Sequence, residues 1–402
     1  MPILPKAPIL PKALAGAIAG LVFGLMAGPA AAAPCGGDFT GFLRGIEAEA
    51  ASLGHPPDRA RAFLAGARQD PKVIRADRSQ GVFRKSFIEF SRALISPSRI
   101  DNGRANARRH ADTFERIART YGVPAGVLLA FWAFETDYGA VQGDFNTRDA
   151  LLTLAHDCRR PDLFRPQIFA AMTLFARGDF DPQRTTGAWA GEIGQVQMLP
   201  ADILANGVDG DGDGHVTLKT SAPDALMSGA KMLQALGWRA HEPWLQEVTL
   251  PATLDWSRTG LDTTLPVADW ARMGVRGRSA PLAPGLRGSI LLPMGRKGPA
   301  FIAYPNFHVY FAWNKSFVYV TTSAYFATRL EGAPVYDPGN PEPGLGPDAM
   351  KALQQRLAAR GHDVGAIDGI LGARTRAAVQ KEQVRLGLPA DAWPTRVLLD
   401  RL

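Results

Sequence analysis

Hydrophobic positions in the first third of the chain recur three and four residues apart, which is the spacing of one helix face. The pattern is clearest over Phe83 to Leu94 and Ala111 to Tyr121, and it returns at 163–176 and 223–236. Apolar residues at this period pack on one side of a helix. Residues 36–135 are therefore predicted to be mostly α-helical, and a second helical group follows.

One predicted helix carries an acidic residue among bulky apolar groups. It starts at Val123-Pro124, because proline suits a first helical turn, and Gly139 is expected to end it. Its i, i+3, i+4 and i+7 positions share a face and are occupied by Leu128, Phe131, Trp132 and Glu135. A carboxyl group held against apolar side chains has a raised pKa, because desolvation disfavours its charged form. Glu135 is thus a candidate acid/base; the alternative is a helix-end Glu that is solvated or paired with Arg.

The pattern changes after residue 244, where short β-type stretches alternate with Gly/Pro turns. They lie at 248–250, 289–292, 301–304 and 308–311 and predict a small mixed α/β subdomain. The predicted fold class is therefore α+β, mostly α, with a catalytic domain over 34–330.

A change in composition separates the last part of the chain. Residues 331–347 hold five Pro and four Gly, a composition that we expect to form a semi-extended linker without a buried core. Residues 348–402 are predicted to form a small three-helix module, in which Asp348 caps a helix that Gly361 ends.

The first 33 residues have the pattern of a cleavable secretory signal. Lys6 and Lys12 precede the apolar run Ala13 to Ala27, and cleavage is expected near Ala32. Pro34 before Cys35 does not fit a lipoprotein site. We therefore expect a periplasmic protein without a membrane anchor in its mature chain.

Charge and cysteine content limit which partners and which cellular compartment we expect. The formal net charge of +7 comes without dense Lys/Arg stripes, so a nucleic-acid partner is not expected. The two cysteines, Cys35 and Cys158, are expected to form a disulfide in an oxidising compartment. Two unrelated thiols are the alternative.

Three separated blocks resemble the membrane-bound lytic murein transglycosylase B family over about residues 36–330. Phe134 to Gly139 is similar to its Glu-Thr-x-Tyr-Gly signature. Trp189 to Pro200 resembles its Ala-Gly-x-x-Gly-Gln-x-Gln-Met-x-Pro motif. Asn306-Phe307, Trp313 to Ser316 and Tyr319 resemble its Asn-Phe, Tyr-Asn-x-Ser and Tyr positions. In the last module, Asp368 to Thr375 resembles the Asp-Gly-x-x-Gly-x-x-Thr motif of type 1 peptidoglycan-binding domains.

This resemblance implies a lysozyme-like helical core and non-hydrolytic cleavage between N-acetylmuramic acid and N-acetylglucosamine. Glu135 would be the single catalytic acid/base, and no cofactor for catalysis is implied. The partner would be the glycan strands of peptidoglycan; protein partners are unknown. The residues implied to bind the saccharide are Tyr138, Gln195, Gln197, Asn314, Ser316 and Tyr319.

Three positions depart from the family patterns. Glu192 stands where a small residue is expected, which leaves a second carboxylate near the cleft open. Trp313 replaces the motif's Tyr, which keeps an aromatic stacking surface and loses the hydroxyl. Glu382 stands where the binding module usually has Phe, so the packing of that module is in question.

An acidic loop over residues 209–220 has acidic residues at positions 1, 3 and 5 and Gly at position 6, as in a calcium-binding loop. Its twelfth position is Thr220 rather than Glu, so it is not a standard EF-hand. The candidate ligands of a structural Ca²⁺ are Asp209, Asp211, Asp213 and His215. The family resemblance adds Asp224, because similar loops in that family are closed by a later Asp. An unliganded Asp-Gly turn is the alternative.

Three functions are compatible with these features. The first is a periplasmic lytic transglycosylase. The second is a hydrolytic muramidase, in which Glu192 could assist Glu135. The third is a non-catalytic scaffold that binds the cell wall, with its last module contacting wall or protein.

Overall fold

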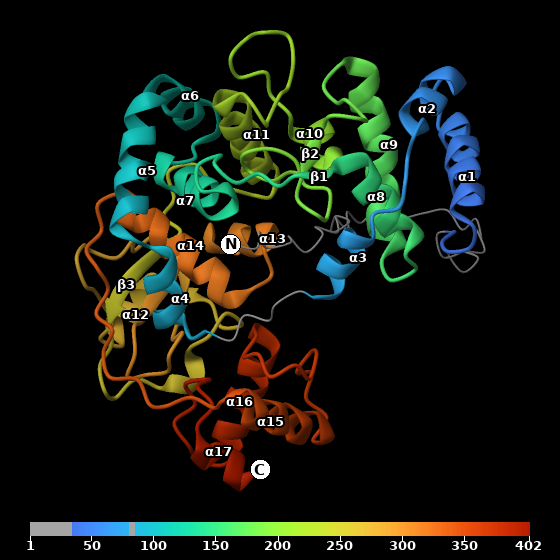
Figure 1. Cartoon of the computed structure of the whole chain (residues 1–402). Coiled ribbons are helices and arrows are strands. Elements are labelled where there is room, and N and C mark those ends of the chain that lie inside the picture. Colours follow the sequence, from blue (N-terminus) through green and yellow to red (C-terminus); the bar gives the residue numbers. More distant parts are fainter. Residues whose placement is uncertain (1–33, 80–84) are drawn as a thin grey trace, which may run out of the picture. The chain divides into compact units, whose positions relative to one another are not determined.

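The computed structural model describes residues 34–79 and 85–402 and forms two compact units (Figure 1). One unit comprises residues up to 80 together with 139–228, and the other comprises 81–138 together with 229–402. The predicted signal over 1–33 lies outside the described residues. The predicted domain boundaries stay predictions.

The first unit is helical apart from one short antiparallel pair of strands. Asp38 starts its first helix by accepting a hydrogen bond from the Gly41 amide at 2.7 Å, and proline opens the next two helices. Its elements are α1 (Phe39–Ser52), α2 (Pro57–Leu64), α3 (Pro71–Arg78), β1 (Phe145–Asn146), α8 (Thr147–His156), α9 (Pro161–Arg177), β2 (Thr186–Gly187) and α10 (Pro200–Asn206). The boundary between the units falls within α11 (Ala222–Ala235).

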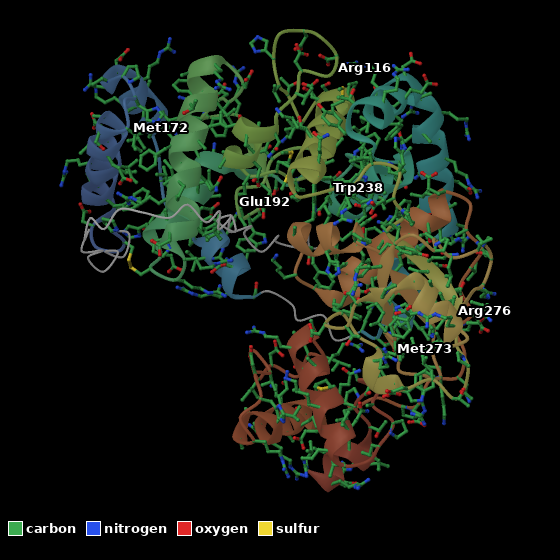
Figure 2. All side chains as sticks on the ribbon, turned by 180° about the vertical axis from the view of Figure 1, so that it is seen from behind. Arg116, Met172, Glu192, Trp238, Met273 and Arg276 are labelled. Carbon is green, nitrogen blue, oxygen red and sulfur yellow. A yellow bond between two sulfur atoms is a disulfide. The ribbon has the colours of Figure 1, made fainter. Side chains whose placement is uncertain are left out.

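A disulfide joins Cys35 to Cys158 within this unit, with the two Cα atoms 5.2 Å apart. It is drawn as a yellow bond in Figure 2. The Gly36 amide also donates to the carbonyl of His156 at 2.8 Å. The start of the described chain is thus fixed to the end of α8.

The helices of the second unit include one that is apolar along almost its whole length. They are α4 (Phe87–Leu94), α5 (Pro97–Arg109), α6 (Ala111–Tyr121), α7 (Ala125–Thr136), α13 (Phe307–Trp313) and α14 (Phe317–Leu330). Ten of the twelve residues of α7 are buried, so this helix is covered on every side rather than on the single face that we expected. It also ends earlier than predicted, because Asp137 and Tyr138 adopt positive φ angles of 52° and 60° before Gly139.

A five-stranded antiparallel sheet forms the predicted mixed subdomain, in the order β4-β6-β7-β3-β5. Its elements are β3 (Leu245–Thr249), β4 (Leu265–Pro266), α12 (Val267–Arg272), β5 (Arg276–Gly277), β6 (Arg287–Leu291) and β7 (Phe301–Ala303), with a 3₁₀ turn at Trp256–Arg258. The strand expected at 308–311 was wrong, because these residues lie in helix α13. Short buried apolar runs do not distinguish a strand from a buried helix.

The C-terminal module has the predicted three helices, α15 (Pro347–Ala359), α16 (Ala373–Arg385) and α17 (Arg396–Arg401). The expected cap by Asp348 is wrong, since α15 begins at Pro347 after Gly346. Glu382 does not disturb the module, because its carboxylate accepts hydrogen bonds from His362 at 2.8 Å and Arg385 at 2.8 Å. Burial alone would raise the pKa of Glu382, but the two hydrogen bonds and the charges of Arg385 and His362 together outweigh it, and the pKa is lowered.

The Pro/Gly segment before the module forms no helix or strand, yet it buries one aromatic ring. Tyr336 is 5% exposed and packs against Tyr325 with ring centroids 4.9 Å apart. Its hydroxyl is 2.9 Å from the Ser91 hydroxyl. Composition gave no sign of this buried ring, and the linker over 331–347 stays a prediction.

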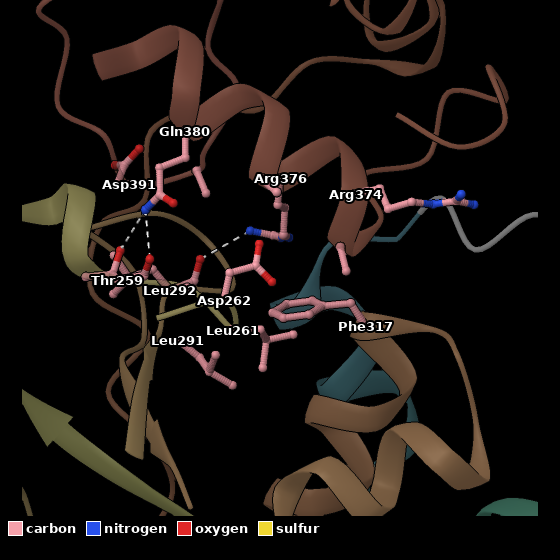
Figure 3. Close-up of a pocket in the computed structure, with 14 residues that line it drawn as sticks. Thr259, Leu261, Asp262, Leu291, Leu292, Phe317, Arg374, Arg376, Gln380 and Asp391 are labelled. Atoms are coloured by element: carbon pink, nitrogen blue, oxygen red, sulfur yellow. Dashed lines mark hydrogen bonds between the residues drawn. The ribbon is translucent and has the colours of Figure 1, made fainter. Parts of the chain in front are cut away.

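The module is docked on the sheet subdomain through buried polar groups of α16. Figure 3 shows the Gln380 amide and the Arg376 guanidinium directed toward main-chain carbonyls of that subdomain. Gln380 donates to the Thr259 carbonyl at 2.8 Å, and Arg376 donates to the Pro293 carbonyl at 2.7 Å. The guanidinium also stacks on Phe317 at 4.5 Å, and burial lowers the pKa of Arg376 to about 9. A cavity of about 180 Å³ remains at this junction.

Among the described residues, no single helix has the length and apolar character needed to cross a membrane. Only α6 and α7 taken together reach that length and composition, and a 115° bend separates them.

The disulfide gives a prediction about stability. It closes a loop over a sequence separation of 123 residues, so replacing both cysteines by Ser should lower the free energy of unfolding by up to about 5 kcal/mol in the chain-entropy model. Urea unfolding should show a lower midpoint for the variant. Reductant should move the native protein toward that midpoint and leave the double-Ser variant unchanged; an unchanged native midpoint would contradict the prediction.

Candidate active site

Glu135 lies in the last turn of α7 and is 3% exposed. The helix begins without a side-chain cap at Pro124, and Glu331, the C-cap of α14, compensates by accepting the Gly126 amide at 2.6 Å. Both ends of α7 are therefore tied to neighbouring elements. This fixes where the Glu135 side chain emerges.

Two donors converge on one oxygen of Glu135. The Tyr319 hydroxyl donates to Oε1 at 2.9 Å, and the Trp313 indole N–H donates to the same atom at 2.8 Å. Burial raises the pKa of Tyr319 well above its ordinary value, and the charge of Glu135 adds to the effect. Tyr319 therefore stays protonated and remains able to donate.

Aromatic rings fix the two donors. Phe131, one turn before Glu135, packs on Trp313 with ring centroids 4.4 Å apart and on Tyr310 at 4.9 Å. Phe134 lies edge-on to Tyr319 at 5.8 Å. The apolar residues predicted beside the carboxylate thus do more than desolvate it, because they also orient its hydrogen-bond donors.

Two of the residues implied to bind the saccharide hold the start of α14. The Ser316 hydroxyl accepts the Tyr319 amide at 3.3 Å, so Ser316 is the N-cap of this helix. Asn314 Oδ1 in turn accepts the Ser316 amide at 2.9 Å. In this structure both residues contribute to the placement of Tyr319.

Tyr138 also has a structural partner. Its hydroxyl donates to the Arg99 carbonyl at 2.7 Å, and its ring lies edge-on to Trp132 at 5.7 Å. Burial raises its pKa. Arg99 in turn forms an ion pair with Asp137 at 3.0 Å, which fixes the turn after α7.

The second motif lies in the other unit and forms a tight loop. Ile193 and Met198 exchange backbone hydrogen bonds across it, and Gln197 takes a φ of 54°. Gln197 donates to the Gly194 carbonyl at 2.8 Å and is 1% exposed. Gln195 lies against Gly139, where an added Cβ would come within 2.8 Å of its Oε1. Position 139 in the first motif therefore needs glycine, because a larger residue would clash with Gln195 of the second motif.

Glu192 belongs to the same loop and is 4% exposed (Figure 2). Its carbonyl accepts the Ala188 amide at 2.9 Å, and a Cβ on Gly187 would lie 2.0 Å from that carbonyl oxygen. The structure thus brings Glu135, Trp313, Asn314 and Tyr319 together in one unit, and it places Glu192, Gln195 and Gln197 in the other.

The acidic loop gathers three of its five predicted ligands. Carboxylate oxygens of Asp209, Asp211 and Asp213 lie within 4.8 Å of one another. The amides of Gly214, Gly212 and Asp213 donate to Asp209 and lower its pKa.

The other two predicted ligands bond elsewhere in this unit. Asp224 is fully buried and ties the loop together by accepting the Gly210 and Thr217 amides at 2.8 and 2.7 Å. The His215 ring bonds to Asp179 at 2.9 Å, which raises the pKa of His215.

One functional contact could not be foreseen from the motifs. We expected Trp313 to offer a stacking surface only, whereas its N–H reaches Glu135. The sequence signal was present, because a buried indole needs a hydrogen-bond acceptor. The residues just before Trp313, however, were expected to form a strand at 308–311, so no helix was foreseen there.

Comparison with known proteins places this arrangement in a family. Residues 38–328 match the transglycosylase SLT domain, and residues 347–402 match the peptidoglycan binding domain. The membrane-bound lytic murein transglycosylase B of Escherichia coli K12 is 26% identical over 58% of this chain; the match covers 63% of that protein, less than two thirds of its length.

Solved structures extend the similarity over nearly the whole chain. SltB3 from Pseudomonas aeruginosa, solved with NAG-anhNAM-pentapeptide, is 36% identical with a TM-score of 0.83, and the match covers 91% of this chain and 99% of SltB3. Slt35 of Escherichia coli, solved with calcium, shares the fold at 24% identity and a TM-score of 0.63, over 74% of this chain and 96% of Slt35. The chain therefore belongs to the transglycosylase SLT domain family.

Proposed function

We propose that this protein is a lytic transglycosylase that cleaves the β-1,4 bond between N-acetylmuramic acid and N-acetylglucosamine in peptidoglycan, leaving 1,6-anhydro ends. The observation that carries the proposal is the buried Glu135 carboxyl with two donors on one oxygen, in a chain of the SLT family. Its relative SltB3 was solved with peptidoglycan fragments, one of them carrying an anhydro end.

The first step uses Glu135 as an acid. Its proton passes to the glycosidic oxygen as the bond from that oxygen to C1 of the muramoyl residue breaks. Burial disfavours the ionised carboxylate, while Tyr319 and Trp313 stabilise the negative charge that develops on it. These opposed influences suit a group that has to lose a proton and regain it.

The second step uses the same carboxylate as a base. It takes the proton of the muramoyl C6 hydroxyl, whose oxygen then bonds to C1. The proton gained replaces the one given, so Glu135 ends as it began. A second carboxylate is unnecessary, because the internal hydroxyl stands in for the water that an inverting hydrolase must activate.

The remaining motif residues are proposed to hold the glycan. Amides of Gln195, Gln197 and Asn314 are suited to hydrogen-bond sugar hydroxyls and acetamido groups. Tyr138 and Ser316 are proposed to act at the same groove. Tyr319 is proposed to act first on Glu135, since its hydroxyl already donates to that carboxylate.

The peptidoglycan-binding module is proposed to hold the chain on the wall, which raises the local concentration of glycan bonds. We propose that the protein works in the periplasm after removal of a signal at 1–33. The disulfide between Cys35 and Cys158 supports an oxidising compartment.

We also propose a structural Ca²⁺ in the acidic loop. Asp209, Asp211 and Asp213 would hold it, because hard cations prefer several carboxylate oxygens and the three already lie together. Asp224 would act indirectly by keeping the loop closed. The cation would relieve the repulsion among the three carboxylates, and it takes no part in the chemistry.

The Glu135→Gln variant should keep its fold and lose wall-lytic activity by at least a thousandfold, because glutamine preserves shape without a transferable proton. Turbidity of purified peptidoglycan measures the loss. The matched control is Glu115→Gln, an exposed glutamate of α6 that should leave the rate unchanged. Lysis by the Glu135→Gln protein at the native rate would refute the proposal.

Product masses separate the two enzymatic alternatives. A transglycosylase gives muropeptides lighter by one water than those of a muramidase. We expect anhydro ends from the native protein and from the Glu192→Gln variant alike. Reducing ends, lost in Glu192→Gln, would instead establish hydrolysis with Glu192 as a second carboxylate.

Calcium at millimolar concentration should raise the thermal midpoint of the protein by several degrees, because a ligand bound only to the folded state stabilises it. The Asp213→Asn variant should lose this response, whereas Asp58→Asn, an exposed acid of α2, should keep it. Differential scanning calorimetry after chelation, with and without added Ca²⁺, makes the comparison. If the native protein has the same thermal midpoint with and without added Ca²⁺, the proposed site is refuted.

A further inference from the structure

Trp313 occupies the position of the motif tyrosine, and it is fully buried at the end of α13. Its indole N–H donates to Glu135 Oε1 at 2.8 Å, and its ring is packed on Phe131 at 4.4 Å. Since Phe131 and Glu135 lie on the same face of α7, the ring contact and the hydrogen bond reinforce one geometry. The side chain that departs from the family pattern thus contacts the proposed catalytic acid itself.

Oxygen Oε1 of Glu135 is already occupied as a hydrogen-bond acceptor. Oε1 accepts from both Trp313 and Tyr319, which uses both of its lone-pair directions. A carboxyl proton placed on Oε1 would have to displace one of these donors. The transferable proton is therefore expected on Oε2.

Because Trp313 carries an indole, the roles of the two Glu135 oxygens do not change with the protonation of the carboxyl group. A tyrosine hydroxyl can donate or accept, so it could reverse its hydrogen bond when the carboxyl becomes protonated. An indole N–H only donates and does not titrate in the working range. With Trp at this position, Oε1 stays an acceptor in both protonation states.

We propose that Trp313 is a positioning residue for Glu135. Its indole N–H can only donate, so it fixes Oε1 as the acceptor and assigns proton transfer to Oε2. The same hydrogen bond favours the ionised carboxylate, which takes the second proton. The catalytic part of this statement rests on the proposed function. The hydrogen bond and its response to the ionisation of Glu135 do not.

The direct test follows the indole N–H by NMR. The chain has eight Trp residues, and the Trp313 signal is identified by its absence in Trp313→Phe. Its proton resonance should move downfield as Glu135 ionises, because a hydrogen bond to a charged acceptor is stronger. The Glu135→Gln variant should abolish this titration. A Trp313 resonance that does not change with pH in the native protein would overturn the proposal.

The pH dependence of kcat/KM tests the functional consequence. Removing a hydrogen bond from the ionised form keeps the carboxyl protonated to higher pH, so the alkaline limb should move upward by about one pH unit in Trp313→Phe. Replacing Trp313 by β-(3-benzothienyl)alanine, which has sulfur in place of N–H, should give the same shift while preserving the ring. This second variant keeps the test valid if phenylalanine leaves too large a cavity to fold.

The matched control is Trp270→Phe in the sheet subdomain. Trp270 is equally buried and its indole also donates, to the Gly288 carbonyl at 2.9 Å, but it does not contact Glu135. The Trp270→Phe variant should lower stability without moving the alkaline limb of kcat/KM. If the alkaline limb of kcat/KM lies at the same pH in the native protein and in the benzothienyl variant, the proposal is overturned. Full lysis by Glu135→Gln, together with an indole titration in the native protein that this variant abolishes, would instead refute only the proposed function.

Discussion

A buried carboxylate has to be hydrogen-bonded, and this constraint accounts for much of the second unit. Glu135 is enclosed by α7 and by neighbouring aromatic rings, and it satisfies one oxygen through Trp313 and Tyr319. These donors come from two consecutive helices, α13 and α14. The cap at Ser316 and the hydrogen bond from Ser316 to Asn314 set the turn between the two helices. Several motif residues are therefore explained by the need to aim two donors at one atom.

The same principle governs the junction with the C-terminal module. Arg376 is buried without an ion pair among the described residues, and its charge is met by two carbonyls and the face of Phe317. Phe317 is the first residue of α14, the helix that carries Tyr319. The C-terminal module thus contacts the helix that helps hold the proposed acid. The linker predicted at 331–347 is therefore followed by a module that is itself docked on the sheet subdomain.

Sequence reasoning succeeded where the physical signal is local. The mostly helical character, the three-helix module and the β-type subdomain follow from period and turn residues, and the family follows from three motif blocks. It failed at 308–311, where a buried apolar run fits a strand and a helix equally well. The burial of Tyr336 was not foreseen either, because it depends on the rings of Phe87 in α4, far away in the sequence, and Tyr325 in α14.

The sequence by itself determined which residue could carry a proton, because an acidic side chain among apolar neighbours on one helix is a local pattern. It also determined that three carboxylates gather in one loop, since their spacing is fixed by the chain. Only the tertiary structure decided how the Glu135 carboxyl is held, because its donors lie 178 and 184 residues away. It likewise decided that Asp224 closes the acidic loop through backbone amides rather than joining the carboxylate cluster. Hydrogen-bond direction depends on atoms brought together by folding, and no spacing along the chain specifies it.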